Sequence, residues 1–132
     1  MALSGRFHHM DIYVGDLDRT VTFWAPLFDA IGWHTNVERP TVKSWTNGET
    51  ELFFVQSETE FVAQGYHRKR VGLNHYAFSV NDRAGLEQLR ARVVAQGARM
   101  LYGGDIEDTP TQHRFFFEDP DRIKIEVLAP RG

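Results

Sequence analysis

Hydrophobic and polar residues alternate in short runs along this chain, and each alternating run indicates a strand with one buried face. Near the N-terminus, Met10, Ile12 and Val14 alternate with His9, Asp11 and Tyr13. The same alternation returns much later, where Tyr76, Phe78 and Val80 alternate with His75, Ala77 and Ser79. Because the apolar members of each run share a face, we expect that face to pack against helices and the other face to carry polar side chains.

The two runs belong to a longer internal repeat. Residues 7–16 align with residues 73–82, and three positions are identical, namely His9 with His75, Val14 with Val80 and Asp16 with Asp82. A helix-like stretch follows each segment, over 17–30 in the first copy and 83–96 in the second. Each aspartate stands at a helix N-cap position, and a glycine follows each stretch, as is typical of helix ends.

Three strand-like runs follow each helix. They cover about 33–38, 42–45 and 50–56 in the first copy, and about 99–102, 112–118 and 122–128 in the second. Asn47-Gly48 is a hairpin turn signal in the first copy, and Asp119-Pro120-Asp121 supplies a turn in the second. The sequence therefore predicts an α+β fold of two βαβββ modules within a single domain over 1–132. Module one covers about 7–56, a linker about 57–72 and module two about 73–129, with a loop over 103–111.

Strand alternation also predicts where metal-binding side chains point. His9, Glu51, His75 and Glu126 lie on four strands at matching places in the two copies, each opposite the apolar positions of its strand. If the sheets curve, these side chains line the inside of a cup with the helices outside. Imidazole and carboxylate ligands suit zinc, iron(II), manganese or nickel, and two histidines with one carboxylate form a known iron(II) pattern. Glu51 would add a fourth ligand.

The remaining histidines have no matching partner in the repeat. We expect surface or structural roles for His34, His67 and His113, and a helix-side or strand-edge position for His8. The basic run at 68–70 could meet an anionic substrate from the linker, but a solvated surface segment is the favoured interpretation.

Composition excludes several classes of protein. The chain has no cysteine, so disulfides, thiolate catalysis, cysteine-ligated zinc and iron–sulfur clusters are excluded. A net charge of −3 without a dominant basic patch disfavours nucleic-acid binding. No apolar run is long enough for a signal peptide or a membrane span, so we expect a cytoplasmic protein without membrane contact.

Three segments carry a family resemblance over about residues 7–129. They are HMDIYVGDLDRTVTFW at 9–24, LNHYAFSVND at 73–82 and FFFEDPDRIKIEV at 115–127. In this order and spacing the chain resembles the vicinal oxygen chelate superfamily, which includes glyoxalase I, extradiol dioxygenases, and fosfomycin and bleomycin resistance proteins. The family's turn glycine is replaced by Arg122, which should be tolerated if its φ is negative.

The resemblance implies a cupped mixed sheet around a divalent metal ion held by His9, His75 and Glu126, with Glu51 near the fourth ligand position. It also implies a small-molecule substrate and a homodimer. We expect a glyoxalase-type lyase or isomerase, with Glu126 or Glu51 as the general base that takes a proton beside a carbonyl group. The alternatives are an iron(II) extradiol-type dioxygenase and a metal-free binding or bleomycin-resistance protein. The sequence does not identify the substrate.

Overall fold

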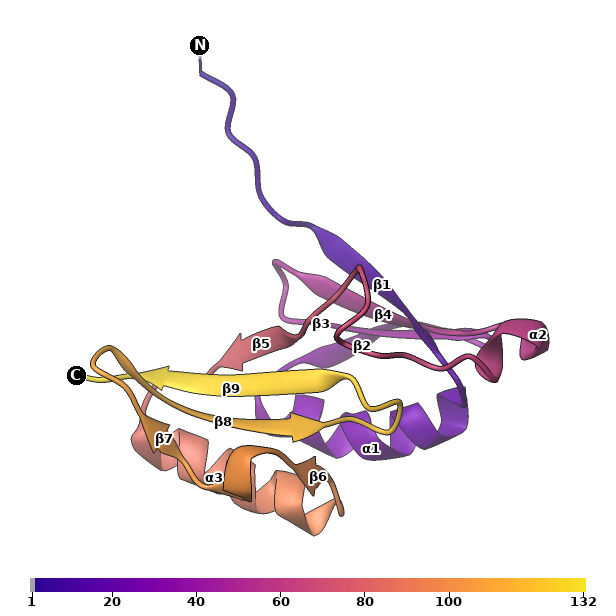
Figure 1. Ribbon diagram of the computed structural model, residues 1–132. Helices are drawn as coiled ribbons and strands as arrows, with labels where there is room; N and C mark the ends of the chain where they lie inside the picture. Colours follow the sequence, from indigo (N-terminus) through magenta and orange to yellow (C-terminus); the bar gives the residue numbers. More distant parts are fainter. Residues whose placement is uncertain (1) are drawn as a thin grey trace. The chain divides into compact units, whose positions relative to one another are not determined.

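A computed structural model describes residues 2–132, which form two compact units, and the chain passes from the first to the second between Ala63 and Gln64 (Figure 1). The first unit contains β1 (His9–Val14), α1 (Leu17–Ala30), β2 (His34–Arg39), β3 (Val42–Thr46), β4 (Glu51–Gln56) and the short helix α2 (Thr59–Val62). The second contains β5 (Tyr76–Ser79), α3 (Arg83–Ala95), β6 (Arg99–Met100), the 3-10 turn η1 (Tyr102–Gly104), β7 (Glu107–Asp108), β8 (Gln112–Glu118) and β9 (Lys124–Pro130).

The two units repeat one sheet topology. The strand order is β1-β4-β3-β2 in the first and β5-β9-β8-β6 in the second, where β7 also pairs with β8. In both, the first strand runs parallel to the last, and the last pairs antiparallel with the strand before it. The predicted α+β fold with a duplicated βαβββ unit is therefore confirmed. The joining of the two sheets into one cup stays a prediction.

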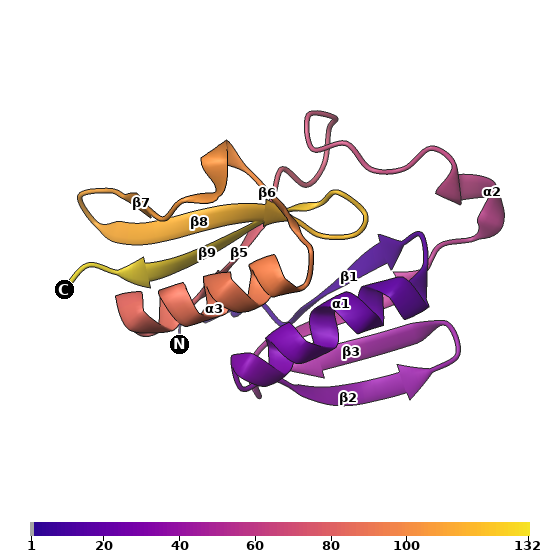
Figure 2. The same cartoon turned by 90° about the horizontal axis from the view of Figure 1, so that it is seen from below.

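In the first unit, α1 crosses one face of the sheet (Figure 2). Asp16 caps the helix by accepting a 3.1 Å hydrogen bond from the backbone N–H of Arg19. Phe28 is fully buried and stacks on Trp45 of β3, with ring centroids 4.8 Å apart. The buried side chains of β1, Ile12 and Val14, alternate with exposed ones, as the sequence pattern predicts.

In the second unit, α3 lies across the other sheet, mainly against β9 and β8 (Figure 2). Asp82 caps this helix through a 2.8 Å hydrogen bond from the N–H of Gly85. Fully buried Leu86 of the helix and Ile125 and Val127 of β9 belong to the core. Because Glu126 lies between the two β9 residues, its side chain leaves the sheet on the face opposite α3.

Four local features differ from the sequence-based expectations. The linker contains the single-turn helix α2, and the expected loop over 103–111 contains η1 and β7, which extends the sheet by pairing Glu107 with Arg114. His75 lies one residue before β5 and not on the strand. Arg122 has φ +66, so the condition under which arginine would be tolerated there, a negative φ, is not met.

The cause of the Arg122 conformation is the turn between β8 and β9. Asp119 closes the turn by accepting the Arg122 N–H at its carbonyl, at 2.9 Å, and the Ile123 N–H at Oδ1, at 3.0 Å. The chain must reverse within these few residues, which requires the left-handed conformation that glycine adopts most readily.

No helix within residues 2–132 is both long and apolar enough to cross a membrane.

Candidate functional site

Histidine and glutamate side chains meet directly in the second unit. His75 Nε2 lies 3.0 Å from Glu126 Oε1, although the residues are 51 positions apart in sequence. The Glu126 side chain is 9% exposed and that of His75 is 32% exposed, so the pair is largely shielded from solvent. The ring of His75 also contacts Phe116 edge to face, at 6.1 Å between centroids. His75 and Glu126 therefore lie on the sheet face away from α3.

Two neighbouring amides orient this pair. His75 Nδ1 donates to Asn74 Oδ1 at 2.6 Å, and Gln112 Nε2 donates to Glu126 Oε2 at 3.3 Å. A neutral imidazole that donates through Nδ1 presents a lone pair at Nε2. Two acceptor atoms then face each other across 3.0 Å, an arrangement that is favourable only with a proton or a cation between them.

The separation of the two atoms suits a shared metal ion. Ligand atoms about 2.1 Å from one ion and at right angles to each other lie roughly 3.0 Å apart. The donation from His75 Nδ1 to Asn74 is also the usual support for a metal-binding histidine, because it fixes the tautomer that leaves Nε2 free to ligate. The chemistry and spacing of this pair thus fit a divalent cation.

The first unit holds the other two predicted residues on neighbouring strands. His9 of β1 is the register partner of Glu51 of β4 in the parallel pairing. The His9 ring packs edge to face on Phe53, with centroids 5.5 Å apart. Its Nδ1 lies 2.9 Å from Nδ1 of His8, and its Nε2 lies 3.7 Å from Asp11 Oδ1. His9 is exposed and lies beside the imidazole of His8. The sequence pattern predicts a strand-edge or helix-side position for His8.

Glu51 is held by two side chains of its own sheet. Its Oε2 accepts hydrogen bonds from Ser44 Oγ at 2.6 Å and from Asn36 Nδ2 at 2.9 Å. Burial alone would raise the pKa of Glu51, but these bonds and the nearby imidazoles of His8 and His9 bring its pKa below the usual value. Glu51 is therefore an anion at neutral pH.

The predicted residues thus form two pairs, His75 with Glu126 and His9 beside Glu51. Within neither unit, over residues 2–132, do three histidine, aspartate or glutamate side chains gather closely enough to hold an ion. Each pair belongs to the equivalent parallel strand pair of the repeat, because His9 and Glu51 stand on β1 and β4, and His75 and Glu126 at β5 and β9.

A comparison of the chain with known protein families bears on the duplicated fold. The model of one family matches residues 6–127, nearly the whole chain. The chain belongs to the Glyoxalase/Bleomycin resistance protein/Dioxygenase superfamily. The resemblance seen in the sequence motifs is confirmed.

Relatives within the superfamily cover the chain almost completely. YqjT of Bacillus subtilis, an uncharacterised protein, is 35% identical over 93% of this chain and 98% of its own length. The crystal structure of a "putative glyoxalase" from Bacillus halodurans is 36% identical, with a TM-score of 0.89 and 96% of each chain covered. The fosfomycin resistance protein FosX of Mesorhizobium loti has the same fold, with 21% identity, a TM-score of 0.69 and coverage of 97% of this chain and 93% of its own.

Sequence reasoning missed the polar side chains that orient the predicted residues in this superfamily member. Asn74 and Gln112 support the second pair, and Ser44 and Asn36 support Glu51. Asn74 is the one with a sequence signal, because it stands directly before the repeated histidine.

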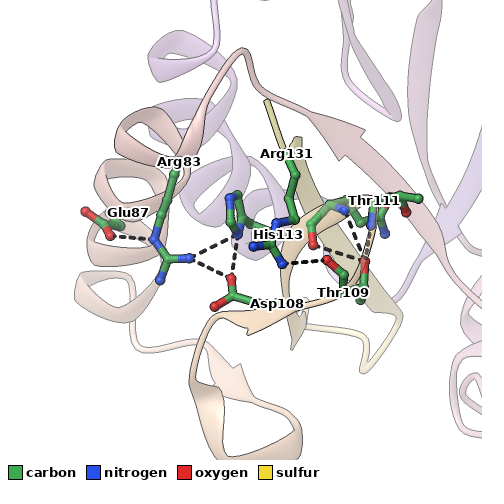
Figure 3. Close-up of polar contacts among 8 residues, drawn as sticks. Arg83, Glu87, Asp108, Thr109, Thr111, His113 and Arg131 are labelled. Carbon is green, nitrogen blue, oxygen red and sulfur yellow. Dashed lines mark hydrogen bonds and ion pairs between the residues drawn. The ribbon is translucent and has the colours of Figure 1, made fainter.

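A further polar cluster ties the β7 hairpin to the start of α3 (Figure 3). Arg83 Nη1 lies 2.6 Å from Asp108 Oδ1 and 3.0 Å from His113 Nδ1, and its Nε donates to Glu87 at 3.1 Å. His113 Nδ1 lies 2.5 Å from Asp108 Oδ1. Hydrogen bonds with His113 and Arg83 lower the pKa of Asp108. This cluster has the structural role expected for His113.

Proposed function

We propose that this protein is a metal-dependent enzyme of the glyoxalase type, which binds two neighbouring oxygens of a small substrate and transfers a proton as a lyase or isomerase. The observation that carries the proposal is the largely buried His75–Glu126 pair, whose Nε2 and Oε1 atoms lie 3.0 Å apart. In this proposal His9, His75 and Glu126 hold a zinc, nickel, manganese or iron(II) ion, and Glu51 is the fourth ligand.

When bound, the ion would act as a Lewis acid that stabilises negative charge on the substrate oxygens. Glu126 would take the proton from the carbon beside the substrate carbonyl, because its carboxylate is shielded from water and is positioned by Gln112. Glu51 is the weaker candidate base, because Ser44 and Asn36 both donate to its Oε2 and stabilise the charged form. In the neutral imidazole of His75, Asn74 would favour the tautomer with the proton on Nδ1, which leaves the Nε2 lone pair for the ion.

The same hydrogen bonds favour one alternative. If Glu51 stays bound to Ser44 and Asn36, the ligands are His9, His75 and Glu126 alone. Two histidines and one carboxylate leave open positions on iron(II), as in oxygenases. The second candidate function is therefore an extradiol-type dioxygenase.

The test is metal content measured by mass spectrometry on protein that carries no polyhistidine tag, after supplementation with each ion and dialysis. We expect about one ion per chain in the wild type, with a large loss in His75→Ala and Glu126→Gln. The matched control is His34→Ala, because His34 is exposed on β2 and has no place in the proposed site. Unchanged metal content in His75→Ala, or no bound ion in the wild type, would overturn the proposal and favour a metal-free binding protein.

Activity measurements on the loaded wild type distinguish the two enzymatic candidates. Exchange of the proton beside the carbonyl of a 2-hydroxyketone, followed by NMR in D₂O, supports the lyase or isomerase. Oxygen uptake with a catechol and iron(II), without such exchange, identifies the dioxygenase and overturns the first proposal.

A further inference from the structure

The second unit contains a small pocket lined by basic side chains. It encloses about 180 Å³ and is lined by Tyr66, His67, Arg68, Lys69 and Arg122. No acidic side chain is among these lining residues, and three of the five carry a full positive charge. Pockets for drug-sized ligands begin at about 300 Å³, so this pocket fits a compact charged group.

The positively charged side chains around Glu118 outnumber this one carboxylate. Glu118 of β8 is buried, and Arg68 Nη1 donates to its Oε2 at 2.7 Å. Two further guanidiniums approach the other oxygen, with Nε of Arg99 and Nε of Arg122 each 3.6 Å from Oε1. One carboxylate balances one of these three charges, and Lys69 adds another beside the pocket.

Two further carboxylates, those of Asp119 and Asp121, belong to the same turn as Arg122. Asp119 directs Oδ1 into its own turn, where it accepts the N–H groups of Asp121 and Ile123 at 2.9 and 3.0 Å. Neither aspartate lines the pocket.

Arg122 adds a second observation at the same pocket, because arginine stands where the turn would suit glycine. It has φ +66, in the left-handed region where a side chain is strained and where glycine would be the unstrained choice. Strained residues persist where function requires them. The ion pair of Arg122 with Glu118, at 3.6 Å, exceeds hydrogen-bond length, and 68% of the Arg122 side chain is exposed. The guanidinium is thus placed at the pocket with donors available to an anion.

We propose that this pocket binds a phosphate-type oxyanion, with Arg122 and Lys69 as its principal donors. Arg68, fixed by its short bond to the buried Glu118, adds positive charge to the wall of the pocket. The planar guanidinium of Arg122 matches two oxygens of a phosphate, and the Lys69 ammonium adds a point charge. The site uses none of the proposed metal ligands, so it stands or falls separately from the proposed function.

The experiment is isothermal titration calorimetry of the full chain with inorganic phosphate and, separately, with methyl phosphate, at constant ionic strength set by chloride. We expect saturable binding of one anion per chain, weakened at least fivefold by Arg122→Gly and by Lys69→Gln. The matched control is Arg39→Gln, which removes the same charge from an exposed position on β2 in the other unit. Tighter binding of methyl phosphate than of inorganic phosphate identifies the anion as part of a larger ligand, and equal binding identifies the free ion.

Arg122→Gly keeps the test independent of folding, because glycine suits the backbone at this position and the variant should be folded by circular dichroism. Phosphate affinity equal to that of the wild type in the folded Arg122→Gly variant would overturn the proposal. An equal loss in Arg39→Gln would do the same, because it would show unspecific attraction, as would the absence of saturable binding to the wild type.

Discussion

Replacement of Arg122 by glycine should stabilise the protein, although it removes an ion pair. A left-handed conformation costs a residue with a side chain about 1–2 kcal/mol, and glycine avoids this cost. Against that gain, glycine loses more backbone entropy on folding, by roughly 0.5–1 kcal/mol. The lost contact with Glu118 contributes little, because it is 3.6 Å long, 68% of the Arg122 side chain is exposed, and Arg68 still neutralises Glu118 at 2.7 Å. We therefore expect a net stabilisation of about 0.5 kcal/mol.

The sharper comparison is with Arg122→Ala, which removes the same charge and keeps the strain. The glycine variant should be more stable than the alanine variant by about 1 kcal/mol, since the loss of the ion pair is common to both. Urea denaturation followed by circular dichroism measures this difference if the slope of the transition is unchanged. An alanine variant as stable as the glycine variant would show that the backbone at Arg122 is not strained, and would also remove one support for the phosphate site.

Three further predictions concern the fold. Phe78→Ala should destabilise by roughly 3–5 kcal/mol, because the side chain is 8% exposed in the core; a melting temperature near that of the wild type would mean that the faces of β5 are reversed. Asp16→Ala should cost about 1 kcal/mol in urea denaturation through loss of the α1 cap, and a neutral result would contradict the capping role. Hydrogen bonds with His113 and Arg83 lower the pKa of Asp108, so its ionised carboxylate stabilises the fold above about pH 4. This contribution is lost as the pH falls through the lowered pKa. The melting temperature of the wild type should therefore exceed that of Asp108→Asn at pH 7, and the difference should shrink as the pH falls below about 4. A difference that does not change with pH would refute the linkage.

The repeat made most of the fold predictable from sequence. Residues 7–16 and 73–82 match closely enough to fix two copies of one unit, and the capping aspartates Asp16 and Asp82 mark both helix starts. The errors fall where backbone geometry depends on distant contacts. The strand β7 exists because Glu107 pairs with Arg114 across a turn, and a two-residue strand has no periodicity of its own.

The left-handed Arg122 escaped prediction for a related reason. Its side chain carries no preference for that conformation, and the turn imposes it through Asp119, which binds the N–H groups on both sides of the reversal. Sequence motifs indicate that a turn exists, whereas the sign of φ follows from how the turn closes. Arg122 thus breaks the rule that left-handed backbone favours glycine, and it does so at a basic pocket. This coincidence supports the proposed phosphate site.

The candidate metal site shows the same limit at the level of side chains. Strand alternation places Glu126 opposite the apolar residues of β9, and the structure agrees with that placement. Alternation cannot reveal whether His75 Nε2 carries a proton, because the tautomer depends on Asn74, whose amide accepts from Nδ1. Residue type and period thus predict which groups share a face. Hydrogen bonds with residues such as Asn74 and Gln112 determine whether those groups attract each other or need a cation between them.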